Sequence, residues 1–153
     1  MLKKDILKSL NNLKTNIMRN IILLFFSTGI FFTANAQKSD YQLVEQTLNY
    51  YMEGGSNKDF DTLKKAFHET ATMKYITDEG YKEVNALEFF SGMKPGPRVD
   101  RKNRIAEITV SGHAANARLE LEYANFTFVD FMNLLKIDGE WKIVSKIFYK
   151  RAE

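Results

Sequence analysis

The two candidates for a general acid or base in this sequence are His68 and Asp130. Histidine is the usual proton-transfer residue near neutral pH, because its side chain ordinarily titrates there. His68 follows the apolar Phe67 at the expected end of a helix, where the helix dipole also favours a histidine for structural reasons. A catalytic and a structural role therefore stay open for His68, whereas His113, in a Ser-Gly-His turn, is expected to be a solvated loop residue.

Asp130 stands in an otherwise apolar run that begins at Phe126. A carboxylate on an inward face of such a strand is desolvated, which is the environment that general bases need. Alternate positions put Asp130 on one face with Phe128, while Phe131 lies on the opposite face, so both faces are apolar. Two alternatives stay open, an inward carboxylate or a rim or edge position paired with a nearby Lys or Arg.

The last strand contains Trp141 and Lys146. Counting by two puts Lys146 on a mixed face with Lys142, while Trp141 and Ile143 share the other face. This pattern favours an exposed position or a dimer surface for Lys146. Trp141 is expected to be a core anchor, with stacking against a ligand as the alternative.

Other kinds of chemistry have no support in the sequence. The chain has no cysteine and only two histidines, 45 positions apart, so we expect neither disulfides nor a transition-metal site. No serine lies in a Gly-x-Ser-x-Gly motif, and Gly54-Gly55 lacks the Lys-Ser or Lys-Thr of a phosphate-binding loop. We expect no cofactor.

The first 36 residues have the three parts of a secretory signal. Arg19 and the lysines before it are basic, residues 21–32 form an apolar run, and Ala34 and Ala36 are the small residues before a cleavage point. An apolar run of this length is too short for a membrane-spanning helix, which takes roughly 20 residues, so no stable anchor is expected. The sequence predicts cleavage after Ala36 and a secreted or periplasmic protein, with Met18 as an alternative start.

The charge of the chain also depends on this leader. The whole sequence has 22 basic and 19 acidic side chains, and the leader holds five of the basic and one of the acidic ones. Residues 37–153 thus keep 17 basic and 18 acidic side chains, close to neutral. A near-neutral domain has no electrostatic basis for binding a polyanion, so nucleic acid is not an expected partner.

Residues 37–153 are expected to form one α+β domain with its helices first. Ser39 and Gln42 form a capping box that begins a helix, and Gly54-Gly55 is expected to end it. Two shorter helices follow, one with Phe60, Leu63 and Phe67 as its apolar stripe and one over residues 86–90. Alternating patterns then predict strands over 105–110, 115–123, 126–137 and 141–149, after two short strands at 71–76 and 81–84. Such segregation is typical of helices packed on an antiparallel sheet.

Four segments stand in a distinctive order along the chain, namely Tyr50-Tyr51-Met52-Glu53-Gly54, Ala66-Phe67-His68, Val110-Ser111-Gly112-His113 and Leu134 to Lys146. Together they resemble the lumazine-binding-like family of the nuclear-transport-factor-2-like superfamily, and the resemblance extends over residues 40–149. It implies a cone, in which a curved sheet wraps around N-terminal helices and encloses an apolar pocket. It also implies frequent homodimers, but no particular reaction, because this fold hosts both enzymes and binding proteins.

The aromatic content of the predicted cone suits a small hydrophobic or aromatic ligand, although it suits a plain core equally well. Expected pocket residues are Tyr51, Phe67, Met73, Tyr75, Phe89, Phe90, Phe128, Asp130 and Trp141. The preferred interpretation is an exported, homodimeric small-molecule-binding domain without defined catalysis. One alternative is an isomerase or dehydratase that uses Asp130 or His68 as base with a tyrosine as hydrogen-bond donor. The other is a dimeric interaction module whose pocket is filled by its own side chains.

Overall fold

The structure is a computed structural model that describes residues 4–6, 8, 10, 13–14 and 38–152. Residues 1–36 and 37–153 form separate units, and the second unit contains the sheet. Met18, the apolar run at 21–32 and the expected cleavage point after Ala36 all lie outside the described residues. Within the described part of the chain, no helix is long and apolar enough to cross a membrane.

The first long helix, α2 (Asp40–Asn57), begins as the sequence predicts. The Ser39 side chain accepts a hydrogen bond from the Gln42 backbone, and the Gln42 side chain accepts one from the Ser39 backbone, at 3.3 and 2.9 Å. The two bonds satisfy two of the unpaired N–H groups at the start of the helix. The buried face of α2 includes Val44, Leu48 and Tyr51, which recur at helical spacing.

The expected end of this helix at Gly54-Gly55 is wrong, because α2 continues through both glycines to Asn57. Lys58 then ends it in the left-handed conformation, with φ of 55°. Gly54 has a packing role instead. A Cβ at this position would lie 2.5 Å from the backbone nitrogen of Leu63, so only glycine allows the next helix to approach this closely.

The second helix is shorter than expected. It comprises α3 (Phe60–Leu63) and one 3₁₀ turn, η1 (Lys64–Ala66), and the chain then enters β1 (Phe67–Thr77). Phe67 and His68 therefore belong to a strand, and the expectation that His68 ends a helix is wrong. Phe67 is buried and pairs with Ile143 of the last strand, so tertiary pairing outweighs the helical pattern here.

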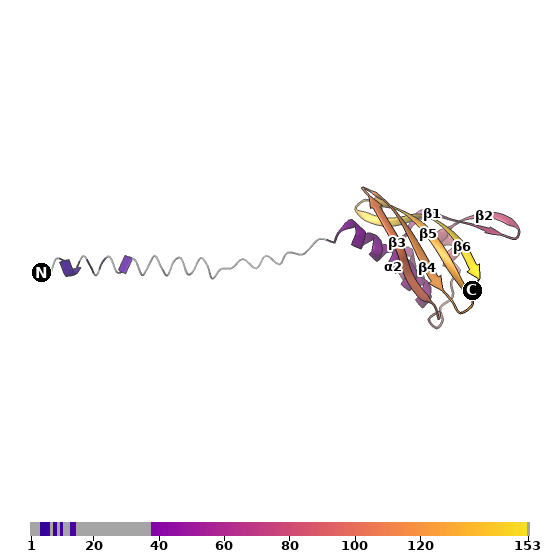
Figure 1. The fold of residues 1–153 in the computed structure, drawn as a ribbon, viewed down its shortest axis with the longest axis horizontal. Coiled ribbons are helices and arrows are strands. Elements are labelled where there is room, and N and C mark those ends of the chain that lie inside the picture. Colours follow the sequence, from indigo (N-terminus) through magenta and orange to yellow (C-terminus); the bar gives the residue numbers. More distant parts are fainter. Residues whose placement is uncertain (1–3, 7, 9, 11–12, 15–37, 153) are drawn as a thin grey trace. The chain divides into compact units, whose positions relative to one another are not determined.

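Six strands form one sheet in the order β2-β1-β6-β5-β4-β3. The remaining elements are β2 (Gly80–Asn85), α4 (Ala86–Ser91), β3 (Lys102–Ser111), β4 (Ala114–Glu122), β5 (Phe126–Ile137) and β6 (Glu140–Ala152). Neighbouring strands are antiparallel except β1 and β6, which are parallel, so the sheet is mixed rather than antiparallel throughout. The sheet curves, and α2 lies against its inner face (Figure 1).

The predicted hairpin between β5 and β6 is present. Asp138 and Gly139 both have positive φ, 50° and 85°, as a tight type I′ turn requires. The register of this strand pair shifts once. Asn133 pairs with Ser145, but the next residue, Leu134, pairs with Ile143, so Val144 is an extra residue on β6. The result is a β-bulge in the middle of this strand.

The bulge at Val144 reverses the alternation of faces along β6. Trp141 and Ile143 are buried before it, and Lys146 is buried after it, although simple counting separates these residues. The expectation that Lys146 lies on an exposed face is therefore wrong. A period of two holds only while the ladder is regular, and the extra residue moves every later side chain of β6 to the opposite face.

Candidate functional site

Three polar side chains meet inside the cone, Tyr51 of α2, Asp130 of β5 and Lys146 of β6. The Tyr51 hydroxyl donates a hydrogen bond to Asp130 Oδ2 at 2.7 Å, and Lys146 Nζ donates one to the Tyr51 hydroxyl oxygen at 2.9 Å. Lys146 Nζ also lies 2.9 Å from Asp130 Oδ1 as an ion pair. We call these three residues the interior triad.

The interior triad is withdrawn from water. Asp130, Tyr51 and Lys146 are 0%, 4% and 5% exposed. Of the two alternatives for Asp130, the structure shows the inward position, and the carboxylate has a lysine partner as well. A buried charge needs such pairing, because taking an isolated ion out of water is very costly.

Burial shifts the pKa values of Lys146 and Tyr51 in the directions that favour their neutral forms. Desolvation lowers the pKa of Lys146 below its usual 10.5, with Arg101 lowering it further, while Asp130 opposes this shift. Desolvation and then the Asp130 carboxylate raise the pKa of the Tyr51 phenol well above its usual 10. Tyr51 is thus a neutral donor over the physiological pH range, and the Lys146 ammonium releases its proton more readily than an ordinary lysine.

The sheet register explains why the two charged groups of the triad meet. Asp130 pairs with Phe148 on β6, and Lys146 pairs with Met132 on β5, so the two side chains are diagonal neighbours on the inner face. Tyr51 reaches them from the buried stripe of α2, one turn after Leu48. A hairpin of two consecutive strands and a helix far before it in the sequence therefore position the site.

Aromatic side chains adjoin the interior triad. The Lys146 ammonium lies 4.5 Å from the ring centroid of Phe148. Phe148 stacks on Tyr75 at 4.9 Å and packs edge-on against Phe128 at 5.6 Å. These three aromatic residues are half-buried, so a wall of rings leads from the surface to the amine.

A second polar cluster, which the sequence analysis did not identify, joins the end of α2 to β3. Arg101 donates hydrogen bonds to Ser56, to the Met52 carbonyl and to the Tyr123 hydroxyl, all at 2.8–3.0 Å. Asn103 donates to the same Ser56 at 2.9 Å. The sequence offered little signal for this cluster, because Arg101 and Asn103 follow the proline-containing loop with no motif around them.

Two buried oxygen atoms have acceptor capacity to spare. Asp130 Oδ1 and Asn103 Oδ1 receive no aligned hydrogen bond from the described residues. Asp130 Oδ1 still has its ion pair with Lys146 Nζ at 2.9 Å. Buried polar atoms are satisfied in the great majority of cases, so Asn103 Oδ1 is the oxygen that suggests a donor supplied by a ligand or by water.

The structure brings several of the expected pocket residues together. Tyr51, Phe67 and Phe90 form a cluster of rings with centroids 5.7–6.0 Å apart. Met73 is buried and pairs with Lys146 across the parallel strands, and Tyr75 and Phe128 belong to the aromatic wall. The expected set therefore lies largely around the interior triad.

Two expected pocket residues lie elsewhere. Phe89 is 53% exposed and packs edge-on against Phe90, because the short helix α4 presents successive residues to opposite sides. Trp141 is 3% exposed, and its indole nitrogen donates a hydrogen bond to Asp40 at 3.0 Å. Trp141 thus ties β6 to the start of α2, as expected of a core anchor.

The two histidines are apart from this chemistry. His68 Nδ1 lies 2.8 Å from the hydroxyl of Thr70, two residues further along β1, and the pair is exposed. His113 lies in the exposed turn between β3 and β4. Of the two acid–base candidates, Asp130 has partners in the interior and His68 has a local partner at the surface.

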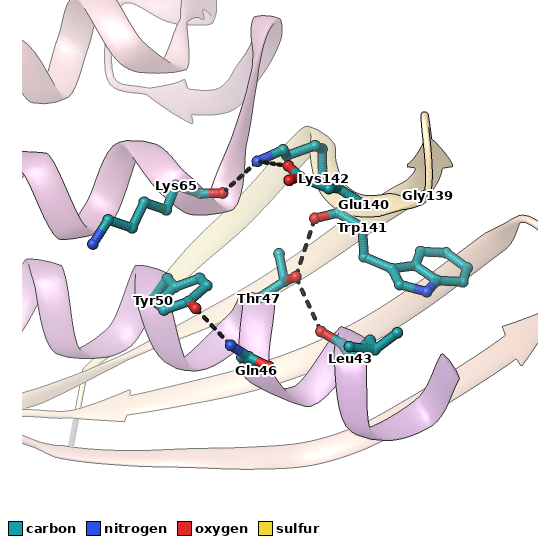
Figure 2. Close-up of a pocket in the computed structure, with 9 residues that line it drawn as sticks. All are labelled: Leu43, Gln46, Thr47, Tyr50, Lys65, Gly139, Glu140, Trp141 and Lys142. Carbon is teal, nitrogen blue, oxygen red and sulfur yellow. Dashed lines mark hydrogen bonds and ion pairs between the residues drawn. The ribbon is translucent and has the colours of Figure 1, made fainter. Parts of the chain in front are cut away.

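A shallow groove of about 310 Å³ runs between α2 and the start of β6 (Figure 2). Across it the Thr47 hydroxyl donates to the Trp141 carbonyl at 3.1 Å, and Lys142 donates to the Lys65 carbonyl at 3.0 Å. Tyr50 accepts a hydrogen bond from Gln46 at its edge. The polar groups of this groove hold α2 and β6 together.

Metal ligands do not gather in the described part of the chain, since no three His, Cys, Asp or Glu side chains lie close enough to hold an ion.

Solved structures define the class of the fold. The chain is similar to a nuclear-transport-factor-2-like protein of unknown function from Shewanella baltica OS155, with 29% identity, a TM-score of 0.67 and coverage of 76% of this chain and 100% of that one. A similar protein from Methylobacillus flagellatus KT, also of unknown function, has 30% identity, a TM-score of 0.66 and coverage of 77% and 97%. The fold is therefore of the α+β nuclear-transport-factor-2-like class.

Sequence comparison places the chain within that class. Residues 39–149 match the model of the family described as "Putative lumazine-binding", and the chain belongs to this family. It is also 25% identical to a protein named aldolase FrzH from Cladobotryum sp, over 114 residues that cover 72% of this chain and 91% of that protein.

Proposed function

We propose that the domain binds a small molecule with an apolar, aromatic body and a polar end that carries a carbonyl or anionic oxygen. The carrying observation is the interior triad, in which an ammonium, a hydroxyl and a carboxylate lie within 2.7–2.9 Å of each other at near-zero exposure. Ligand sites typically combine an apolar lining with a few convergent polar groups. The aromatic wall of Tyr75, Phe128 and Phe148 supplies the lining.

The polarity of the triad suits an oxygen on the ligand. The Lys146 ammonium is the donor for such an oxygen, while the Tyr51 hydroxyl donates to Asp130 Oδ2 and Asp130 Oδ1 pairs with Lys146, so both hold the ammonium in position. In a site without water these interactions are stronger than they are in solution. A ligand that lacks a polar end would leave the same groups without a new partner, so the site discriminates against it.

Fluorescence of 1-anilinonaphthalene-8-sulfonate tests this proposal, because the probe combines an aromatic body with an anionic oxygen end. Saturable binding by the folded protein is expected, and Lys146→Met is expected to weaken it about tenfold or more, as loss of a charged partner costs about 1.5–3 kcal/mol. Lys142→Met is the control, since Lys142 lies in the surface groove. Equal binding by both variants, with native circular dichroism, would contradict the proposal.

A second candidate function is proton transfer next to a carbonyl group, which one observation favours. Asp130 and the Tyr51 hydroxyl are 2.7 Å apart in the interior, so a base and a hydroxyl donor stand next to each other. The distant relative named an aldolase is consistent with carbonyl chemistry on this fold. Exchange of α-hydrogens of a bound ketone for deuterium, lost in Asp130→Asn, is the measurement that separates this candidate from binding alone.

We also propose that the protein is exported and forms a homodimer. Export rests on the leader pattern before Gln37. The dimer rests on the outer sheet face, where Phe131, Leu135 and Ile147 are exposed side chains of neighbouring strands. A mass spectrum of the native protein from its host, under non-denaturing conditions, would show the mature N-terminus and the oligomer. A monomer, or a chain that retains residues 1–36, would contradict these two proposals.

A further inference from the structure

The Lys146 amine has an environment that differs from that of an ordinary ion-pair lysine. Two of its contacts are the Tyr51 hydroxyl and Asp130, and a third side of the ammonium faces the ring of Phe148. Tyr51 and Asp130 therefore fix the position of the amine, and the remaining side of the amine faces an apolar ring. A fixed, desolvated amine is the form of lysine that attacks carbonyl carbons.

We propose that Lys146 is a nucleophile that forms an imine with a carbonyl carbon of the bound ligand. This inference rests on the proposed function, because it takes place in the same interior site. It adds the substrate class, an aldehyde or ketone with an aromatic or apolar body, and it makes the Lys146 nitrogen the atom that bonds to the ligand.

The supply of neutral amine follows from the triad. Lys146 Nζ lies 2.9 Å from Asp130 Oδ1, so the carboxylate can take one ammonium proton directly. Burial lowers the pKa of Lys146, which raises the fraction of neutral amine near neutral pH. In the next step Asp130 gives this proton to the carbonyl oxygen of the ligand.

The reaction balances without an outside reagent. The neutral amine attacks the carbonyl carbon, a carbon–nitrogen bond forms, and the carbonyl electron pair moves to oxygen, which takes the proton held by Asp130. The nitrogen of the resulting carbinolamine carries two protons, and the ionised Asp130 passes one of them to the hydroxyl, which leaves as water. The lysine ammonium and the carbonyl thus yield one protonated imine and one water, with Asp130 ionised as at the start. The Tyr51 hydroxyl stays neutral because its pKa is raised, and it can donate a hydrogen bond to the oxygen if it turns away from Asp130 Oδ2, its acceptor in this structure.

A route to Lys146 passes the aromatic wall. Phe148 contacts the ammonium and also lines a groove of about 490 Å³ beside β1 and β6, together with Tyr75 and Tyr81. Phe148 is the residue that the groove and the ammonium share, so a ligand in the groove has to displace its ring to reach Lys146. The groove is mainly apolar along its length, which matches an aromatic aldehyde or ketone better than a sugar-like one.

Neighbouring lysines on the same strand lack this setting. Lys142 lies 2.9 Å from the exposed Glu140 and donates to the Lys65 carbonyl, so it keeps both water and a charge partner. Lys150 is exposed and lies over the ring of Phe126. These two residues are therefore matched controls, with the same chemistry in a different environment.

Borohydride trapping with 2-naphthaldehyde tests the inference on residues 37–153 or the full chain. Reduction of an imine leaves one naphthylmethyl group on the lysine, and peptide mass spectrometry locates it. We expect Lys146 to be modified severalfold faster than Lys142 or Lys150 near neutral pH, because burial lowers the pKa of Lys146 and the triad holds its amine in place. 2-Naphthylmethanol, which has the same body and no carbonyl, is expected to slow the modification of Lys146 alone.

The outcomes separate the two proposals. Modification spread evenly over the surface lysines, with Lys146 unmodified while 1-anilinonaphthalene-8-sulfonate still binds, would overturn the imine and leave the binding function. Loss of probe binding as well would overturn both. Lys146→Arg, which keeps a cation at the triad and cannot form an imine, is expected to bind the probe and to lose the trapped adduct at this position.

Discussion

Lys142 and Lys146 are four residues apart on β6, and their surroundings differ sharply. Lys142 pairs with the exposed Glu140 at the surface groove, whereas Lys146 pairs with Asp130, which has no exposed surface at all. The same residue type is solvated in one place and desolvated in the other. An exposed ion pair contributes little to stability, and a buried pair is costly to break, so only the interior lysine is chemically unusual.

The physical cause of this difference is the bulge at Val144. In a regular strand two residues four positions apart lie on the same face. The extra residue on β6 shifts the later side chains, so that Lys146 joins the buried face of Trp141 and Ile143. Bulges that re-aim a side chain are frequent beside active sites, which fits the position of this one next to the interior triad.

The largest expected effect is that of breaking the buried pair. Asp130→Ala leaves Lys146 buried without a charged partner, so we expect a loss of about 3–5 kcal/mol in the free energy of unfolding, measured by urea denaturation. Glu140→Ala removes the partner of Lys142 and is expected to change stability far less, because that pair is exposed. Equal losses in the two variants would abolish the contrast between the lysines.

The double variant Asp130→Leu with Lys146→Met is a control on the same pair. It removes both charges and keeps the side-chain volume similar, so it is expected to recover most of the stability that Asp130→Ala loses. Failure to recover would mean that packing rather than the unpaired charge causes the loss.

The next effect concerns the hydroxyl that joins both charged groups. Tyr51→Phe leaves Asp130 Oδ2 and Lys146 each short of one hydrogen bond, so a loss of about 1–3 kcal/mol is expected by urea denaturation. Tyr50→Phe, one position away, removes a hydroxyl that accepts only from Gln46 at the surface groove, and a smaller loss is expected. A larger loss of unfolding free energy in Tyr50→Phe would mean that the groove hydroxyl contributes more to stability than the Tyr51 hydroxyl.

The pH dependence of stability tests the shifted pKa of Lys146. Its pKa is lowered in the folded protein, so between that value and 10.5 the unfolded chain binds more protons and stability rises with pH. Tyr51 acts in the opposite sense, because its raised pKa removes stability as pH rises above 10. The stability of the wild type relative to Lys146→Met is therefore expected to increase as pH rises toward 10, in a urea series. A flat difference would show that Lys146 titrates like a surface lysine.

The smallest expected effect lies in the surface groove. Thr47→Val removes the hydroxyl that donates to the Trp141 carbonyl, and a loss of about 0.5–1.5 kcal/mol in unfolding free energy is expected. The residues that line the groove do not include those of the interior triad, so binding of 1-anilinonaphthalene-8-sulfonate is expected to stay unchanged. Weakened probe binding with unchanged stability would place the ligand in the groove instead.

The sequence by itself determined much of this protein. The capping box at Ser39, the hairpin at Asp138-Gly139 and the strand alternation over residues 115–123 are local signals, and each was confirmed. The α+β class also followed from the order of such signals, and the family followed from the resemblance of segments over residues 40–149. Local propensity and patterning are encoded within a few residues, so a single chain is enough to read them.

Only the tertiary structure decided the site. The sequence singled out Asp130 and Tyr51, but it could not choose the inner face of β5, because both faces are apolar. It assigned Lys146 to the surface, because a bulge depends on the pairing with β5 and leaves no periodic mark within β6 itself. The three side chains meet across 95 positions of sequence, and that proximity is a property of the folded sheet and helix rather than of any segment.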